Sequence, residues 1–75
     1  MASNYDIAFL RVLMQQSLAD KAQALRCIQV IDEQAQRGQA VTAQQVVVRL
    51  GLCDATQAER IDGATREELQ RLGAP

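Results

Sequence analysis

The sequence of 75 residues contains no histidine and no tryptophan, and Tyr5 and Phe9 are its only aromatic residues. Without histidine, the chain lacks the side chain that most often acts as a general base near neutral pH and that most often binds zinc. Its six hydroxyl side chains therefore have no imidazole to activate them as nucleophiles. We expect a protein that is not an enzyme and that binds no metal ion and no cofactor.

The chain also lacks an excess of charge of either sign, because eight basic and nine acidic residues give a net charge of -1. Proteins that coat nucleic acids carry a clear basic excess. The charge balance therefore argues against a protein that coats a polyanion. It opposes neither self-association nor the binding of another protein.

No apolar run approaches the roughly 20 residues that a transmembrane helix needs, so we expect no membrane insertion. Residues 1–6 lack the basic and apolar segments of a secretory signal. Cys27 and Cys53 form no CxxC motif, and we interpret both as reduced, buried side chains of a cytoplasmic protein, the alternative being a disulfide between them. The length allows one small domain, which we place at residues 1–73, with residues 74–75 as a tail or the start of a linker.

Alanine and glutamine are abundant and together account for 23 of the 75 residues. Both are compatible with helix, and alanine is the strongest helix former. A capping residue followed three positions later by an acidic or amide residue marks a helix start. This pattern occurs at Asp20, Thr42, Asp54 and Thr65, with a weaker example at Ser3.

Glycines mark the predicted helix ends, because a glycine in the left-handed conformation commonly follows the last residue of a helix. We interpret all four glycines in this way: Gly38, Gly51, Gly63 and Gly73. Starts and stops together predict an all-α fold, a compact bundle of about five short helices arranged as two hairpin-like halves. The predicted helices are 4–16, 21–37, 43–50, 55–62 and 66–72.

Apolar side chains at helical spacing predict the buried face of each helix. The predicted inward residues are Ile7, Leu10, Leu13, Met14, Leu25, Ile28, Ile31, Val46, Val47, Leu50, Ile61, Leu69 and Leu72. Leu18 and Leu52 follow predicted helix ends, and we expect both to be buried in the core.

The core of so small a domain cannot enclose every apolar side chain of this sequence. We interpret four of them, which lie in or beside the inward stripes, as a partner-binding patch: Val12, Met14, Val30 and Val48. An exposed apolar patch of this kind suits another helix or a second copy of this chain.

Residues 18–26 match residues 52–60 when the chain is shifted by 34 positions, with Leu, Asp, Gln, Ala and Arg in common. An internal duplication would explain this echo. Convergence explains it equally well, because an apolar residue followed by a capping box is an economical way to build any helical hairpin. Either origin predicts two related halves.

The order of these motifs is similar to that of the small helical N-terminal domains of type II secretion and type IV pilus assembly ATPases, and of related N-terminal modules of bacterial signalling proteins. The similarity covers about residues 6–62. It is carried by Asp6, Phe9, Leu18, Gln23, Gly38, residues 46–48, residues 50–52, Gln57 and Ile61. The resemblance implies a helical fold and a protein–protein docking or regulatory role, as the N-terminal domain of a larger bacterial assembly or signalling protein.

Some members of that family bind cyclic di-GMP through an Arg-Leu-Gly sequence that opens each of two motifs. The corresponding residues here are Ala8-Phe9-Leu10 and Thr42-Ala43-Gln44, so both arginines are missing. We therefore expect no tight binding of cyclic di-GMP. Arg26 and Arg60 occupy matching positions in the echo and are candidates for an anion contact, the alternative being that both are solvated surface charges.

Residues 24–62 also fit a helix-turn-helix transcriptional regulator in which residues 55–62 form the recognition helix. The candidate base contacts are Thr56, Gln57 and Arg60. Three carboxylates lie in or beside the same helix, those of Asp54, Glu59 and Asp62. A recognition helix normally presents an excess of Arg and Lys to phosphate. The charge argues against DNA binding, and we keep this function as the alternative.

Overall fold

The computed structural model describes residues 3–73, and the side chains of residues 3–71. This part of the chain contains four α-helices and no strand. The helices are α1 (Asn4–Gln15), α2 (Lys21–Gln36), α3 (Ala43–Arg49) and α4 (Ala55–Gly73). The prediction of an all-α bundle is confirmed, with four helices rather than five. The predicted tail at residues 74–75 lies outside the described residues.

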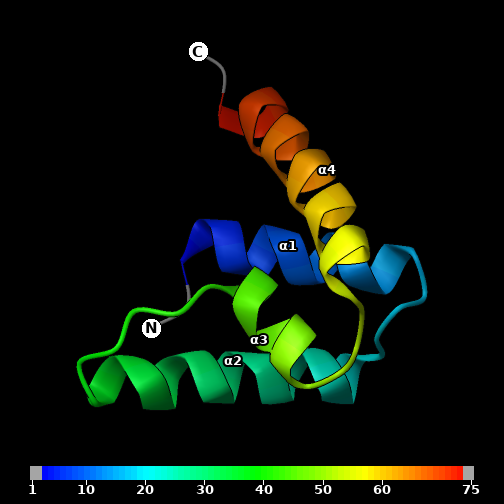
Figure 1. The fold of residues 1–75 in the computed structure, drawn as a ribbon. Helices are drawn as coiled ribbons and strands as arrows, with labels where there is room; N and C mark the ends of the chain where they lie inside the picture. Colours follow the sequence, from blue (N-terminus) through cyan, green and yellow to red (C-terminus); the bar gives the residue numbers. More distant parts are fainter. Residues whose placement is uncertain (1–2, 74–75) are drawn as a thin grey trace.

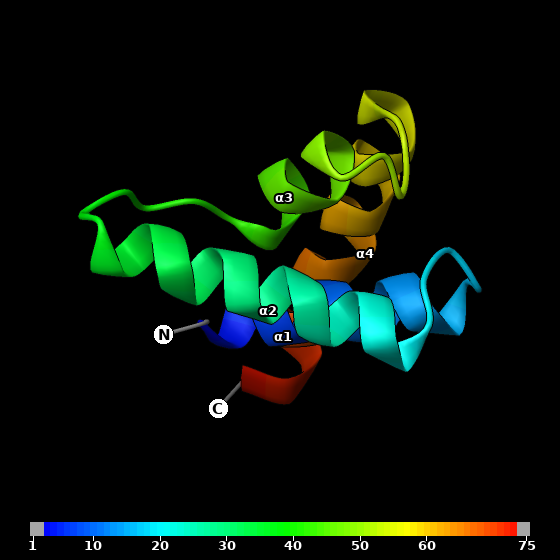
Figure 2. The ribbon, with the colours of Figure 1, turned by 90° about the horizontal axis from the view of Figure 1, so that it is seen from below.

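The helices form two successive pairs that pack across each other. α1 and α2 run in opposite directions side by side, and α4 crosses α1 (Figures 1 and 2). Every pair of helices is in contact except α2 with α4, and the most extensive contact joins α1 to α4. The C-terminal end of α4 extends past α1, on the side away from α3 (Figures 1 and 2).

All four helices begin at a predicted capping residue. Ser3, Asp20 and Thr42 form complete capping boxes. Asp54 and Gln57 exchange the same pair of bonds at the start of α4, where the Gln57 amide donates to the Asp54 carboxylate at 2.7 Å. Each box satisfies two backbone amides that the first helical turn would leave unpaired.

The first helix of each half ends in the same way. Ser17 after α1 and Gly51 after α3 both adopt the left-handed conformation, with φ of 61° and 77°. The next amide then bonds back to the helix, from Leu18 to the Leu13 carbonyl at 3.1 Å and from Leu52 to the Val47 carbonyl at 2.9 Å. This is the Schellman motif. The 34-residue echo is therefore a repeat of structure, from the helix end to the aspartate that starts the next helix.

The prediction that a helix ends near residue 62 and another starts at Thr65 is wrong, because α4 runs without interruption to Gly73. Thr65 is fully buried, and its hydroxyl donates to the Ile61 carbonyl at 2.7 Å. A continuous helix places Ile61, Thr65 and Leu69 on one face. Burial of this face, in the helix pair that makes the most extensive contact, overrides the local signal for a break.

The core gathers side chains from all four helices. Its largest fully buried apolar members are Phe9, Leu10, Leu13, Val46, Val47 and Ile61. Ile31 is also buried, as predicted. Leu18, Ile28, Leu52 and Leu69 are only half-buried, and the side chain of Leu72 lies outside the described residues.

Several residues that we expected to face inward are exposed instead. They are Ile7, Met14, Leu25 and Leu50. α2 contacts α1 and α3 but not α4, so it buries only a narrow stripe of small and medium side chains. Leu25 lies beside that stripe and is 53% exposed. Leu50 is the residue that caps the C-terminus of α3, at the edge of the bundle.

Candidate docking surface

The structure divides the four residues of the predicted patch between core and surface. Val12 is buried and Val30 is half-buried against the core, so neither forms an exposed surface. Val12 is enclosed because α1 contacts all three other helices and buries a wide stripe. Met14 and Val48 remain exposed, at 37% and 39%. These two occupy equivalent positions of the repeat, 34 residues apart.

Val48 lies in an open groove of about 630 Å³ between α3 and α4. We call this the α3–α4 groove, and its lining includes Gln44, Gln45, Val48, Arg49, Ala58 and Glu59. Ala58 is buried, so a small side chain lies where the two helices meet. The groove thus offers two exposed apolar side chains, Val48 and the smaller Ala55, among amides and charges of both signs.

Met14 borders a different, smaller hollow of about 400 Å³ at the turn between α1 and α2. Ser17, Asp20 and Gln23 line it as well. Because Met14 and Val48 line separate hollows, the structure does not join them into one patch.

The two arginines proposed for an anion contact are exposed, Arg26 on α2 and Arg60 on α4. These helices do not contact each other. The structure therefore gives no single site that both guanidinium groups share.

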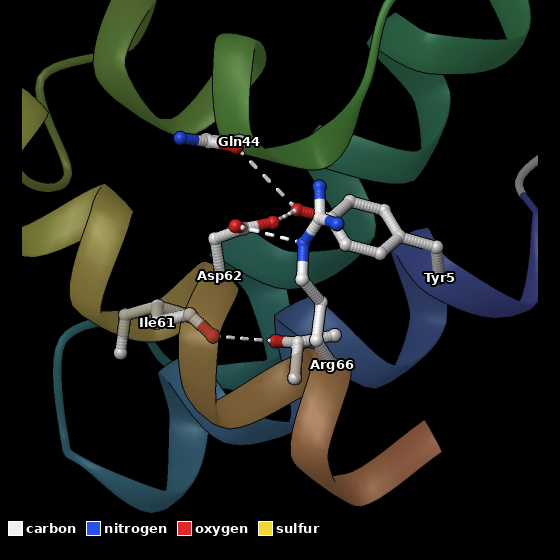
Figure 3. A network of polar contacts seen from close by, with 6 residues as sticks. Tyr5, Gln44, Ile61, Asp62 and Arg66 are labelled. Atoms are coloured by element: carbon white, nitrogen blue, oxygen red, sulfur yellow. Dashed lines mark hydrogen bonds and ion pairs between the residues drawn. The ribbon is translucent and has the colours of Figure 1, made fainter. Parts of the chain in front are cut away.

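A polar network behind the groove was not predicted. The Tyr5 hydroxyl donates to one carboxylate oxygen of Asp62 and lies 3.4 Å from the side-chain oxygen of Gln44. The other oxygen of Asp62 accepts from Nε of Arg66 at 3.0 Å. Figure 3 shows these side chains converging from α1, α3 and α4. The network therefore joins α1 to α4 and reaches Gln44, one of the residues that line the groove.

Tyr5 holds this network as a hydrogen-bond donor. Burial raises the pKa of Tyr5 well above its ordinary value, and the hydrogen bond to Asp62 and the charge of that carboxylate raise it further. The ring also lies against Phe9, with centroids 5.9 Å apart. Tyr5 therefore stays protonated near neutral pH and joins α1 to α4 through its bond to Asp62.

Asp6 connects α1 to the start of α3. One carboxylate oxygen accepts from the backbone amide and the hydroxyl of Ser3, at 3.0 and 2.9 Å. The other oxygen accepts from the buried amide of Ala43 at 2.8 Å. The sequence identified Asp6 as a partner in the cap of α1, but the contact with Ala43, 37 residues away, carries no local signal.

The two cysteines are free thiols. Cys27 and Cys53 are buried, and burial is the main cause that raises the pKa of both thiols. A raised pKa disfavours the thiolate, which is the reactive form of cysteine. Among the described residues, no group of three or more metal-ligating side chains is placed to hold a metal ion.

Comparison of the chain with protein-family models, curated proteins and solved structures finds no significant match. None of the helices that the structure describes is both long enough and apolar enough to cross a membrane. The interpretation of the surface therefore depends on its own geometry and chemistry.

Proposed function

We propose that this chain is a non-enzymatic protein–protein docking or regulatory module that binds its partner in the α3–α4 groove. The observation that carries the proposal is Val48, an apolar side chain 39% exposed in a groove of about 630 Å³. The domain already buries a core that spans all four helices. Val48 lies in a hollow that Ala55 and Ala58 also line, and concave surfaces with apolar lining are typical of binding sites.

The chemistry of the groove suits an amphipathic helix as the partner. A helix can place an apolar side chain over Val48, where the buried Ala58 leaves room for close approach. The amides of Gln44 and Gln45 can satisfy polar groups at its rim. Arg49 on one wall and Glu59 on the other favour a partner with charges of both signs, which would fix its register.

The motif order of residues 6–62 supports the same role. It resembles the small helical N-terminal domains of secretion and pilus assembly ATPases and of bacterial signalling proteins. The proposal is accordingly that the chain acts as the N-terminal domain of a larger bacterial assembly or signalling protein. Alanine and threonine stand at positions 8 and 42, where the cyclic di-GMP motif of that family begins with arginine. We therefore do not propose cyclic di-GMP as a ligand.

The alternative of DNA binding receives less support from the first turns of α4. The side chains of Asp54 and Gln57 are engaged with each other's backbone amides. Asp62 is held by Tyr5 and Arg66. Gln57 then keeps only its side-chain NH2 group for a base, and Glu59 lies between Gln57 and Arg60 in sequence.

The decisive experiment compares Val48→Asp with Met14→Asp, since the two sites are equally exposed and equivalent in the repeat. Proteins retained by the wild-type chain from a bacterial lysate are identified, and their dissociation constants are measured for each variant. Val48→Asp should weaken binding at least tenfold with unchanged circular dichroism, because a buried carboxylate would lack a partner, whereas Met14→Asp should bind as the wild type does.

The same samples test the alternatives. Sedimentation of the wild-type chain tests whether a second copy fills the groove, since Val48→Asp should then reduce self-association. If both variants bind every retained protein normally, and Arg60→Ala alone abolishes binding to duplex DNA, the docking proposal is wrong and the helix-turn-helix function replaces it.

A further inference from the structure

Nothing in the observed conformation requires a glycine at position 63. Gly38 and Gly51 adopt positive φ, as helix ends require, but Gly63 lies inside α4 with helical backbone. A Cβ atom added at Gly63 would meet nothing within 4 Å, so no close packing requires its absence. In a continuous helix this glycine only disfavours the observed state, by about fivefold relative to alanine.

The residues that follow Gly63 carry an unused signal for a helix start. Thr65-Arg66-Glu67-Glu68 has the same capping-box pattern as the four boxes that form elsewhere among the described residues. Thr65 instead donates its hydroxyl to the Ile61 carbonyl at 2.7 Å. The same hydroxyl could accept from the amide of Glu68 if the helix restarted at this point.

The anchoring of α4 changes at the same point. Ile61 and Thr65 are fully buried, whereas no residue among 66–71 is. Figures 1 and 2 show the corresponding end of α4 extending past α1. Among residues 66–71, only Glu68 and Leu69 are even half-buried, so this segment is held less firmly than the part of α4 before it.

Two polar contacts span the junction in the straight helix. The Thr65 hydroxyl reaches back to Ile61, and Arg66 pairs with Asp62 one turn earlier (Figure 3). Asp62 is in turn bonded to Tyr5 of α1. Because the Arg66 side chain is 75% exposed, its ion pair contributes little and can open at small cost.

We propose that α4 is a two-state element with a hinge at residues 63–65. In the observed state the helix is continuous. In the second state Gly63 ends the first helix in the left-handed conformation, and Thr65 with Glu68 caps a separate helix formed by residues 66–73. The second state is the minor one in the isolated chain, since so short a helix is marginally stable without packing. The hinge changes the direction of the segment after Thr65 relative to the other helices.

Nuclear magnetic resonance of the whole chain tests the hinge. In the wild type, amides 63–68 should show relaxation dispersion that is absent from α2 and from residues 56–61. Gly63→Ala favours the straight helix and penalises the left-handed residue, and together these effects should lower the minor population roughly 25-fold and remove the dispersion. Thr56→Ala, an exposed change elsewhere in α4, should leave the dispersion in place.

Amide hydrogen exchange of the same samples detects openings of the hinge that are too rare to give relaxation dispersion. Amides 65–67, whose backbone hydrogen bonds to the carbonyls of residues 61–63 cross the hinge, should exchange as one group, faster than amides 58–62, and should slow by the same factor in Gly63→Ala. Protection that declines gradually toward the end of α4, or that Gly63→Ala and Thr56→Ala change equally, would overturn the proposal. So would helical carbon shifts at residues 63–67 combined with neither dispersion nor a step in exchange.

Discussion

The carboxylate of Asp6 accepts a hydrogen bond from the amide of Ala43 at 2.8 Å, and both residues are buried. This bond fixes the first residue of α3 against the first turn of α1. α3 forms one wall of the proposed docking groove, so the position of that wall depends on Asp6.

Replacement of Asp6 by alanine should lower the free energy of unfolding by about 3 kcal/mol, because the buried Ala43 amide loses its charged acceptor. Asp20→Ala is the matched control, since it removes a capping aspartate that is exposed. Its loss should be about 1 kcal/mol. Urea denaturation of both variants measures the difference, and equal losses would show that the contact with Ala43 contributes nothing.

The Tyr5 hydroxyl should make stability fall at alkaline pH. Its pKa is raised in the folded chain, so the unfolded chain releases this proton first, near pH 10. The stabilisation is complete below that pH and is lost as pH rises further. Denaturation of the wild type and of Tyr5→Phe between pH 8 and pH 11 isolates the contribution of the Tyr5 hydroxyl. The cysteines and Lys21 also titrate in this range, but they are present in both proteins and cancel in the difference.

Tyr5→Phe should lower stability by about 1 kcal/mol at pH 8, through loss of the bond to Asp62. The gap between the two proteins should then narrow above pH 10. A gap that stays constant over the whole range would contradict the assigned role of the Tyr5 hydroxyl.

Ser17 and Gly51 occupy the same left-handed position of the repeat, but only Gly51 suits it. Ser17→Gly should therefore raise the free energy of unfolding by about 1 kcal/mol. Ser17→Ala keeps the strain and serves as the control, with little expected change. Thermal denaturation should place the midpoint of Ser17→Gly several degrees above both other proteins; a midpoint at or below that of Ser17→Ala would contradict the shared geometry.

Leu13 and Leu25 provide a matched pair for the layout of the core. Leu13 is fully buried and Leu25 is 53% exposed. Leu13→Ala should cost about 2–5 kcal/mol because it removes packed methyl groups and leaves a cavity. Leu25→Ala should change stability by less than about 0.5 kcal/mol. If urea denaturation showed similar losses of stability for the two variants, the face of α2 that points to the core would be assigned wrongly.

Local features of this fold were predictable because their partners lie close in sequence. A capping box joins residues three positions apart, so the starts at Asp20, Thr42 and Asp54 were visible in the chain. The repeat was visible for the same reason, and its left-handed residues end α1 and α3 at equivalent positions.

The contacts between helices were not predictable in this way. Tyr5 meets Asp62 across 57 positions, and nothing in either local sequence specifies that pairing. At Thr65 the local sequence did predict a feature, a helix start, that the structure does not contain. Burial of this side chain against the core outweighs the capping pattern. The exposed side chain of the groove was unpredictable for the same reason. Val12 and Val48 are equally apolar, and only the packing of α1 and α3 in the bundle leaves Val12 buried and Val48 exposed.

Binding of a partner in the α3–α4 groove can be observed by titrating the isotope-labelled chain with a protein that it retains. Nuclear magnetic resonance spectra then report which residues the partner contacts. We predict that the largest chemical-shift changes fall on Gln44, Val48 and Ala58, with little change around Met14. Shifts centred on Met14, or on Thr56 and Arg60 with duplex DNA instead of a protein, would contradict this prediction.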